Sequence, residues 1–144
     1  RIGAFKYRTE GWGLTTDRRS LIMSDGSETL YFRNPFSFAI ERKISVTLRG
    51  APLNRINELE FADGKIYANV WQERYIVRIN PADGAVEALV DASSLFSKLP
   101  PLPRQSVLNG IAYNDDAKTF YLTGKNWPLI FEVELINESE NPGK

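Results

Sequence analysis

The 144-residue sequence contains neither cysteine nor histidine. The absence of cysteine removes disulfides, thiolate nucleophiles and cysteine-ligated zinc. The absence of histidine excludes Ser-His-Asp catalysis and histidine-ligated metals within this chain. Any catalysis must therefore come from carboxylates, lysine, tyrosine, amides or a bound cation that prefers oxygen ligands.

The sequence also lacks an excess of one charge and a long hydrophobic run. Its 18 basic and 18 acidic side chains cancel, so no broad field attracts nucleic acid or a membrane surface. No run reaches the roughly 18 apolar residues that a bilayer-spanning helix needs. The opening RIGAFKYRTEGWG is not a signal peptide. We therefore expect a single domain with neither nucleic acid nor membrane among its partners.

What the sequence does contain is a succession of short strand patterns, which predicts an all-β fold. They are rich in β-branched and aromatic residues and are bounded by Gly, Asn, Asp or Pro. Asp-Gly pairs at Asp25, Asp63 and Asp83 predict tight turns between them. Only residues 91–105 interrupt the succession, and their prolines predict a long loop with a helical turn near Ser94 to Lys98. The strand patterns are SLIMSD, TLYFRN, ISVTLRG, LEFADG, KIYANVW, YIVRIN, AVEALVD, GIAYND, TFYLTG and LIFEVEL.

These patterns repeat along the chain. Leu14, Leu59 and Ile111 occupy the same place in three successive repeats, 45 and 52 residues apart. A period of about 40 to 50 residues with about four short strands is the signature of β-propeller blades. We expect one propeller segment over residues 1–144, with blades at about 11–54, 55–105 and 106–144. Residues 1–10, including AFKYRT, would be the end of a preceding blade.

Three blades do not close a ring, because propellers typically have about four to eight. Either the natural chain is longer at its N-terminus, with the first blades missing here, or copies associate to complete the ring. The first is favoured, since the sequence begins inside a blade.

Polar residues recur at fixed places in the repeats. Asn57 and Asn109 each precede the repeat's apolar residue by two positions. Such an Asn is usually a turn or edge hydrogen bonder, but the innermost strands of a propeller also line its channel. Glu58 and Glu60 alternate with apolar neighbours and therefore share one face of their strand. For Glu60 we expect solvent or an ion pair with Arg55 or Arg78, and the role of Glu58 is open.

A family resemblance is carried by a series of motifs in order over residues 5–136. The chain resembles the plant and bacterial type of glutaminyl cyclase (glutamine cyclotransferase), a five-bladed β-propeller. The resemblance covers about the last three blades. The motifs are EGWGLTTD, LIMSDGS, INELEF, YANVWQ, IVRINPADG, LNGIAY and TGKNWP.

The resemblance implies a glutaminyl-peptide cyclotransferase, which converts N-terminal glutamine to pyroglutamate and releases ammonia. Plant-type members need no catalytic metal, so the resemblance implies no cofactor. The implied partner is a peptide or protein with N-terminal glutamine. Relatives are often extracytoplasmic, which favours a periplasmic or secreted location.

The resemblance also implies site residues. Trp12, Asn57 and Trp71 match positions that line the family's pocket, where the tryptophans would form an apolar wall and Asn57 would hydrogen-bond the substrate. Lys125 would supply a positive charge near the channel. The family's proton-shuttling glutamate lies in an earlier blade, upstream of Arg1, and that role is not transferred to Glu58.

Two other functions compete with this interpretation. Asn57, Glu58 and Asn109 could supply oxygen ligands to calcium in a propeller hydrolase or lactonase. A non-catalytic propeller could instead bind peptide N-termini without turning them over.

Overall fold

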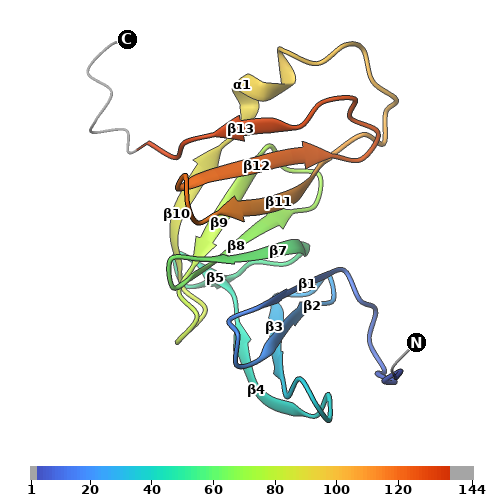
Figure 1. Cartoon of the computed structure of the whole chain (residues 1–144), viewed down its shortest axis with the longest axis vertical. Coiled ribbons are helices and arrows are strands. Elements are labelled where there is room, and N and C mark those ends of the chain that lie inside the picture. The colour runs from blue at the N-terminus through green and yellow to red at the C-terminus, as the bar shows by residue number, and fades with distance from the viewer. Residues whose placement is uncertain (1–2, 137–144) are drawn as a thin grey trace.

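The computed structural model describes residues 3–136, and within them the chain is almost entirely β-sheet (Figure 1). The first sheet has the strand order β1-β2-β3-β4, in which all neighbours are antiparallel. Consecutive strands are thus joined as a meander, which short turns allow. Its strands are β1 (Gly13–Thr16), β2 (Leu21–Ser24), β3 (Thr29–Arg33) and β4 (Ile40–Ser45).

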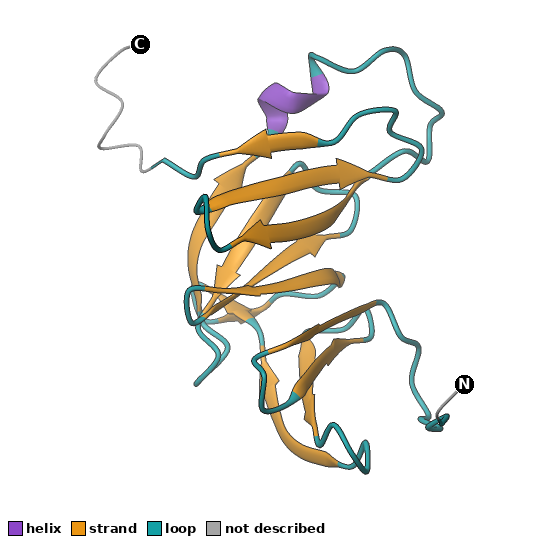
Figure 2. Ribbon diagram, viewed as in Figure 1, coloured by secondary structure: helices purple, strands orange, loops and turns teal. Residues whose placement is uncertain are grey.

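Two further antiparallel sheets follow in chain order (Figure 2). The second sheet contains β7 (Ile56–Ala62), β8 (Lys65–Val70), β9 (Tyr75–Ile79) and β10 (Val86–Asp91). The third sheet contains β11 (Leu108–Asn114), β12 (Thr119–Gly124) and β13 (Phe131–Val133). A small hairpin of β5 (Thr47–Leu48) and β6 (Ala51–Pro52) joins the first two sheets, and the helical turn α1 (Ser93–Phe96) lies between the last two.

The Asp-Gly turns form as the sequence predicts. Asp63 and Gly64, between β7 and β8, have φ values of 48° and 73°. Positive φ at both central positions is the type I′ geometry, whose twist matches that of the flanking strands. The loop over residues 92–107 also agrees with its prediction, with one helical turn followed by an irregular segment.

The three sheets meet along their first strands. Strand β7 lies between β1 and β11 and contacts both (Figure 1). Both β7 and β11 carry a register shift near their N-terminal ends, between Ile56 and Leu59 and between Leu108 and Ile111. Strand β1 pairs with β2 without such a bulge. Bulges redirect side chains at strand ends, and here they fall on Asn57 and Asn109.

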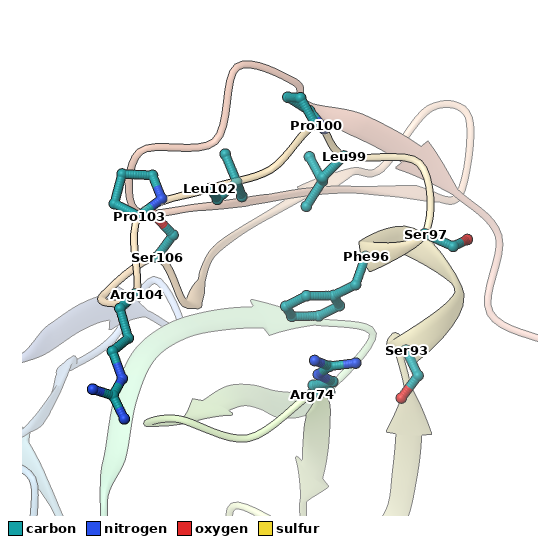
Figure 3. A pocket seen from close by; sticks show the side chains of 10 residues that line it. All are labelled: Arg74, Ser93, Phe96, Ser97, Leu99, Pro100, Leu102, Pro103, Arg104 and Ser106. Atoms are coloured by element: carbon teal, nitrogen blue, oxygen red, sulfur yellow. The ribbon is translucent and has the colours of Figure 1, made fainter.

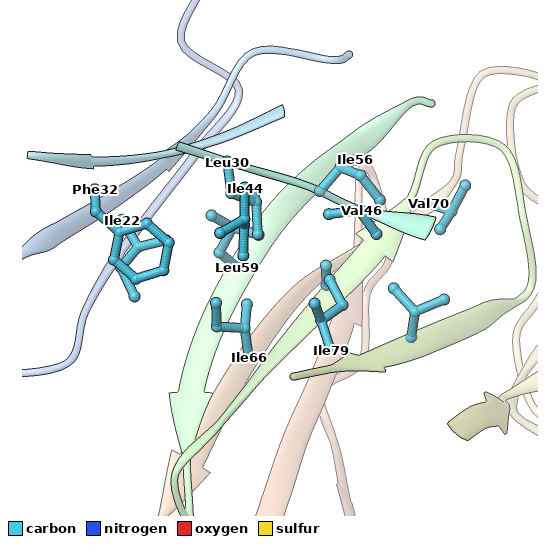
Figure 4. Packing of buried hydrophobic residues seen from close by; sticks show 12 residues of the cluster. Ile22, Leu30, Phe32, Ile44, Val46, Ile56, Leu59, Ile66, Val70 and Ile79 are labelled. Atoms are coloured by element: carbon cyan, nitrogen blue, oxygen red, sulfur yellow. The ribbon is translucent and has the colours of Figure 1, made fainter. Parts of the chain in front are cut away.

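Alternation along β8 fills two hydrophobic clusters. Ile66, Ala68 and Val70 belong to the cluster between the first and second sheets, part of which Figure 4 shows. Tyr67 points the other way, into the cluster between the second and third sheets. Strand β8 is therefore buried on both faces, with every residue after Lys65 buried, whereas the edge strand β10 alternates between partly buried and exposed residues.

The strand expected at AFKYRT does not form. Residues 3–12 contain no strand, because no strand among residues 3–136 pairs with residues 4–9. The aromatic side chains pack instead: the Phe5 and Tyr7 ring centroids lie 5.3 and 5.8 Å from that of Phe38.

Among residues 3–136, none of the helical segments has the length and apolar character to cross a membrane.

Candidate active site

Two equivalent turns lie at the same end of the second and third sheets. Trp71 follows β8 and Lys125 follows β12, and the next residue in each turn has positive φ, 70° at Gln72 and 58° at Asn126. Backbone hydrogen bonds close the turns, from Glu73 to Val70 (3.0 Å) and from Trp127 to Gly124 (3.1 Å). Positive φ at the third position is characteristic of a type II turn, so both side chains occupy the same place on their sheets.

The two tryptophans predicted for the pocket wall are in contact. The rings of Trp12 and Trp71 meet edge to face, with centroids 5.9 Å apart and an interplanar angle of 80°. Trp12 also donates from Nε1 to Glu10 Oε2 at 2.7 Å. Gly26 lies against the Trp12 ring, where any side chain would overlap it. The structure thus joins residues 59 positions apart in the sequence into one aromatic corner.

Asn57 lies beside this corner and is only 6% exposed. Its backbone oxygen accepts a hydrogen bond from Ser24 Oγ at 2.5 Å, and Gly13, next to Trp12, packs so closely on it that a Cβ would clash. The Asn57 side-chain amide has no hydrogen-bond partner among residues 3–136. The amide atoms of Asn57 are not among the fully buried ones without a partner, so this side chain retains donors and an acceptor for another molecule. Asn109, in the equivalent bulge, has a buried Oδ1 that is likewise unpartnered within this range.

Lys125 is exposed and belongs to the third sheet. Its backbone N–H donates to Val107 O at 2.9 Å, which fixes the turn, and its ammonium forms no ion pair within the described part of the chain. The structure therefore brings Trp12, Trp71 and Asn57 together and places Lys125 at the matching turn of the neighbouring sheet.

Glu58 and Glu60 have a role that the sequence did not reveal. Their carboxylates accept hydrogen bonds from the backbone of β11: Ile111 N to Glu58 Oε2 at 2.8 Å and Tyr113 N to Glu60 Oε1 at 2.9 Å. Asn69 Oδ1 accepts from Gly110 N at 3.0 Å in the same row. These side chains satisfy the edge of β11 that no strand pairs with, and they link the second sheet to the third.

The ion pairs expected for Glu60 are absent from the described residues. Arg55 pairs with Glu73 at 2.7 Å, and Arg78 lies 3.6 Å from Glu87. Both arginines thus have carboxylate partners within their own sheet, and Glu60 instead accepts a hydrogen bond from the β11 backbone.

Burial raises the pKa of Glu58 from 4.5 to about 7, and the nearby Glu60 carboxylate adds to the rise, while the Ile111 N–H opposes it. A carboxyl group that titrates near neutral pH can both accept and donate a proton. Among residues 3–136 no group of three or more His, Cys, Asp or Glu side chains lies close enough together to hold a metal ion.

Sequence reasoning missed a hollowed region next to Trp71. Two hollows, of about 300 and 510 Å³, lie under the loop of residues 92–107, and Trp71 lines the smaller one. Arg74, Phe96, Arg104 and Ser106 line both. The prolines of this segment predicted a loop, but only the fold shows that the loop lines a hollow together with Trp71.

The fold and candidate site define an all-β protein of antiparallel sheets, with an aromatic corner and the buried residue Asn57 where the first two sheets meet. The sequence model of the glutamine cyclotransferase family matches residues 1–135, and the chain belongs to this family. It is 36% identical over 146 residues to glutaminyl-peptide cyclotransferase of Arabidopsis thaliana, a match that covers 99% of this chain and 46% of that protein.

A solved structure gives the same result. The crystal structure of Myxococcus xanthus glutaminyl cyclase matches with a TM-score of 0.87 and 40% identity, over 92% of this chain and 59% of that one. The chain thus spans about half the length of the relatives it matches.

Proposed function

We propose that this protein is a glutaminyl-peptide cyclotransferase, which closes an N-terminal glutamine to pyroglutamate. The observation that carries the proposal is the corner of Trp12 and Trp71 beside the buried Asn57, in a chain of the glutamine cyclotransferase family. The three residues have the chemistry that this substrate needs, an apolar wall for its methylenes and an amide for its polar groups.

In this reaction the substrate's α-amine attacks its own side-chain amide carbon. A bond forms between the amine nitrogen and that carbon, the bond from the carbon to the amide nitrogen breaks, and ammonia leaves. The pKa of an α-amine is about 7.7, so a useful fraction is already neutral at physiological pH. The enzyme chiefly has to fold the side chain into attack geometry and move one proton from the amine to the departing nitrogen.

We assign roles to this chain's residues accordingly. Trp12 and Trp71 hold the glutamine side chain, and Asn57 donates to the carbonyl oxygen that gains charge. Lys125 supplies positive charge near the same oxygen. Glu58 has the titration range for the proton transfer, but its Oε2 already accepts from Ile111. We therefore assign the proton shuttle to a glutamate in an earlier part of the propeller and keep Glu58 as the alternative.

We also propose that the three sheets are successive blades of a five-bladed propeller, at about residues 11–54, 55–105 and 106–144. The adjacency of β1, β7 and β11 supports this arrangement, since first strands line the axis of a propeller. The remaining blades come from a longer natural chain or from a second copy.

The test is mass spectrometry of a glutamine-initiated peptide incubated with the protein that contains this chain together with the earlier blades, with and without EDTA. We expect loss of ammonia above the uncatalysed rate, unaffected by the chelator. Trp71→Ala should lower kcat/KM by about 10- to 100-fold, because the glutamine side chain of the substrate is no longer held in attack geometry. Phe36→Ala, at an 87% exposed position, is the control and should have no effect.

Each other outcome points to a different function. Activity abolished by EDTA would favour a metal-dependent hydrolase. Binding of the peptide without turnover would favour a module that only recognises N-termini.

A further inference from the structure

The two hollows under the loop of residues 92–107 lie side by side, and together they are called the trough here. They share Arg74, Phe96, Arg104 and Ser106, and the smaller one extends to Trp71. The trough therefore begins at the tryptophan corner and continues beneath the loop. A substrate held at Trp71 by its first residue would have this trough directly beside it.

The trough is positively charged. Arg74 and Arg104 are exposed, and neither forms an ion pair within residues 3–136. Of the residues that line the hollows only Glu73 is acidic, and it is paired with Arg55 at 2.7 Å. The Arg74 guanidinium lies 4.5 Å from the centroid of the Phe96 ring, which holds its charge in place.

The loop forms the opposite, largely apolar wall. Figure 3 shows Leu99, Pro100, Leu102 and Pro103 along its arch, with Phe96 below them and Arg74 beneath the ring. Arg104 descends from the other side of the trough (Figure 3). Ser106 Oγ is buried there without a hydrogen-bond partner among the described residues. Apolar walls with two separated guanidinium groups suit an extended peptide that carries carboxylates.

We propose that this trough binds the residues that follow the N-terminal glutamine and selects peptides that are acidic there. Arg74 and Arg104 are the specificity-determining residues, and each binds a carboxylate of the peptide. The inference rests on the proposed cyclotransferase function, because the glutamine at Trp71 sets where the peptide enters. It adds a preference for acidic substrates, which that function does not require.

The experiment compares three peptides of equal length, Gln-Glu-Asp-Leu-amide, Gln-Gln-Asn-Leu-amide and Gln-Lys-Lys-Leu-amide, with glutamine amide as the minimal substrate. We expect kcat/KM to be about 3- to 10-fold higher for the acidic peptide than for the neutral one at low ionic strength, and lowest for the basic one. Added salt should reduce the difference, because exposed charges are screened.

Variants connect the preference to the trough. Arg74→Gln combined with Arg104→Gln should bring the acidic-to-neutral ratio close to one and leave turnover of glutamine amide unchanged. Arg19→Gln removes an exposed arginine from the turn between β1 and β2, and it should leave the ratio as it is. An unchanged ratio in the double variant, or no preference in the unaltered chain, would overturn the proposal.

A binding measurement separates this proposal from the cyclotransferase itself. Fluorescence anisotropy of the same peptides, labelled at their C-termini, reports affinity whether or not they turn over. Tighter binding of the acidic peptide that is lost in the double variant would support the trough whether or not ammonia is released. If the protein with its earlier blades bound the peptides in this way but released no ammonia, the trough would be supported and the cyclotransferase function contradicted. Turnover with equal affinities and equal kcat/KM would support the enzyme and contradict the trough.

Discussion

At the scale of single residues, Glu58 combines a structural hydrogen bond with a strongly raised pKa. Its carboxylate accepts a backbone hydrogen bond from the neighbouring sheet, yet burial raises its pKa to about 7. The folded protein therefore binds the Glu58 proton more tightly than the unfolded chain does. The resulting stabilisation is complete below about pH 4.5 and is lost as the pH rises through about 7.

Glu58→Gln tests this pH dependence. The amide keeps an acceptor for Ile111 but carries no charge, so the free energy of unfolding at pH 8 should rise by about 2 kcal/mol. In this variant the decline of the free energy of unfolding between pH 4.5 and 7 should be shallower than in the unaltered chain. Urea denaturation at several pH values measures both effects, with Glu41→Gln on exposed β4 as the control. An unchanged pH profile in Glu58→Gln would mean that Glu58 does not titrate in this range.

The residues of the candidate site were predictable to different degrees. The sequence indicated Trp12, Asn57 and Trp71 through motif resemblance, and the structure brings them together. It could not indicate that Glu58 and Glu60 bind the β11 backbone, because strand alternation predicts a shared face but not the neighbour opposite it. The prediction of ion pairs for Glu60 was wrong because the sequence does not identify which strand lies opposite this side chain.

At the scale of elements, β11 is a strand with one side paired to β12 and the other side satisfied by side chains. Such an edge is usually a risk for unwanted strand pairing. Here Asn69, Glu58 and Glu60 accept its N–H groups. The amides of Ile111 and Tyr113 should therefore be protected from solvent exchange although no strand lies beside them.

Hydrogen exchange by NMR tests this arrangement. Glu58→Ala removes the acceptor, so exchange of the Ile111 amide should become about tenfold faster or more. Glu58→Gln keeps an acceptor and should preserve the protection, and the amide of Val77 in β9 should be unaffected in both. Equal Ile111 rates in the two variants would show that the side chain does not protect this edge.

Element positions followed closely from sequence, with local exceptions. Strands β7 to β12 form where their alternating patterns and turn residues place them. Strand β1 was not recognised as a strand, because GLTT is short and carries one large apolar residue, Leu14. AFKYRT has a strand-like composition but forms no strand, since composition supplies no hydrogen-bonding neighbour.

At the scale of the whole molecule, two hydrophobic clusters share the second sheet. One joins it to the first sheet and the other to the third. Because alternate residues of β8 contribute to both clusters, loss of one cluster removes the support of the other. Unfolding should therefore be a single cooperative transition.

Matched substitutions in the outer sheets test this cooperativity. Ile22→Val in the first sheet and Ile111→Val in the third each remove one methylene from a different cluster. Each should lower the free energy of unfolding by about 0.5–1.5 kcal/mol, with circular dichroism and tryptophan fluorescence giving the same midpoint. Two separated transitions in either variant would show that the sheets unfold independently.

The hydrogen bonds between neighbouring sheets give the row of sheets a direction, because each sheet supplies the acceptor and the next sheet supplies the backbone N–H donor. Thr15 Oγ1 in the first sheet accepts from Phe61 N at 3.1 Å, and Glu60, in the equivalent place in the second, accepts from Tyr113 N. The corresponding residue of the third sheet is Ala112, which has no acceptor to offer. The sheets are therefore not interchangeable parts: a rearranged gene that exchanged the second and third would break this succession, although every sheet kept its own sequence.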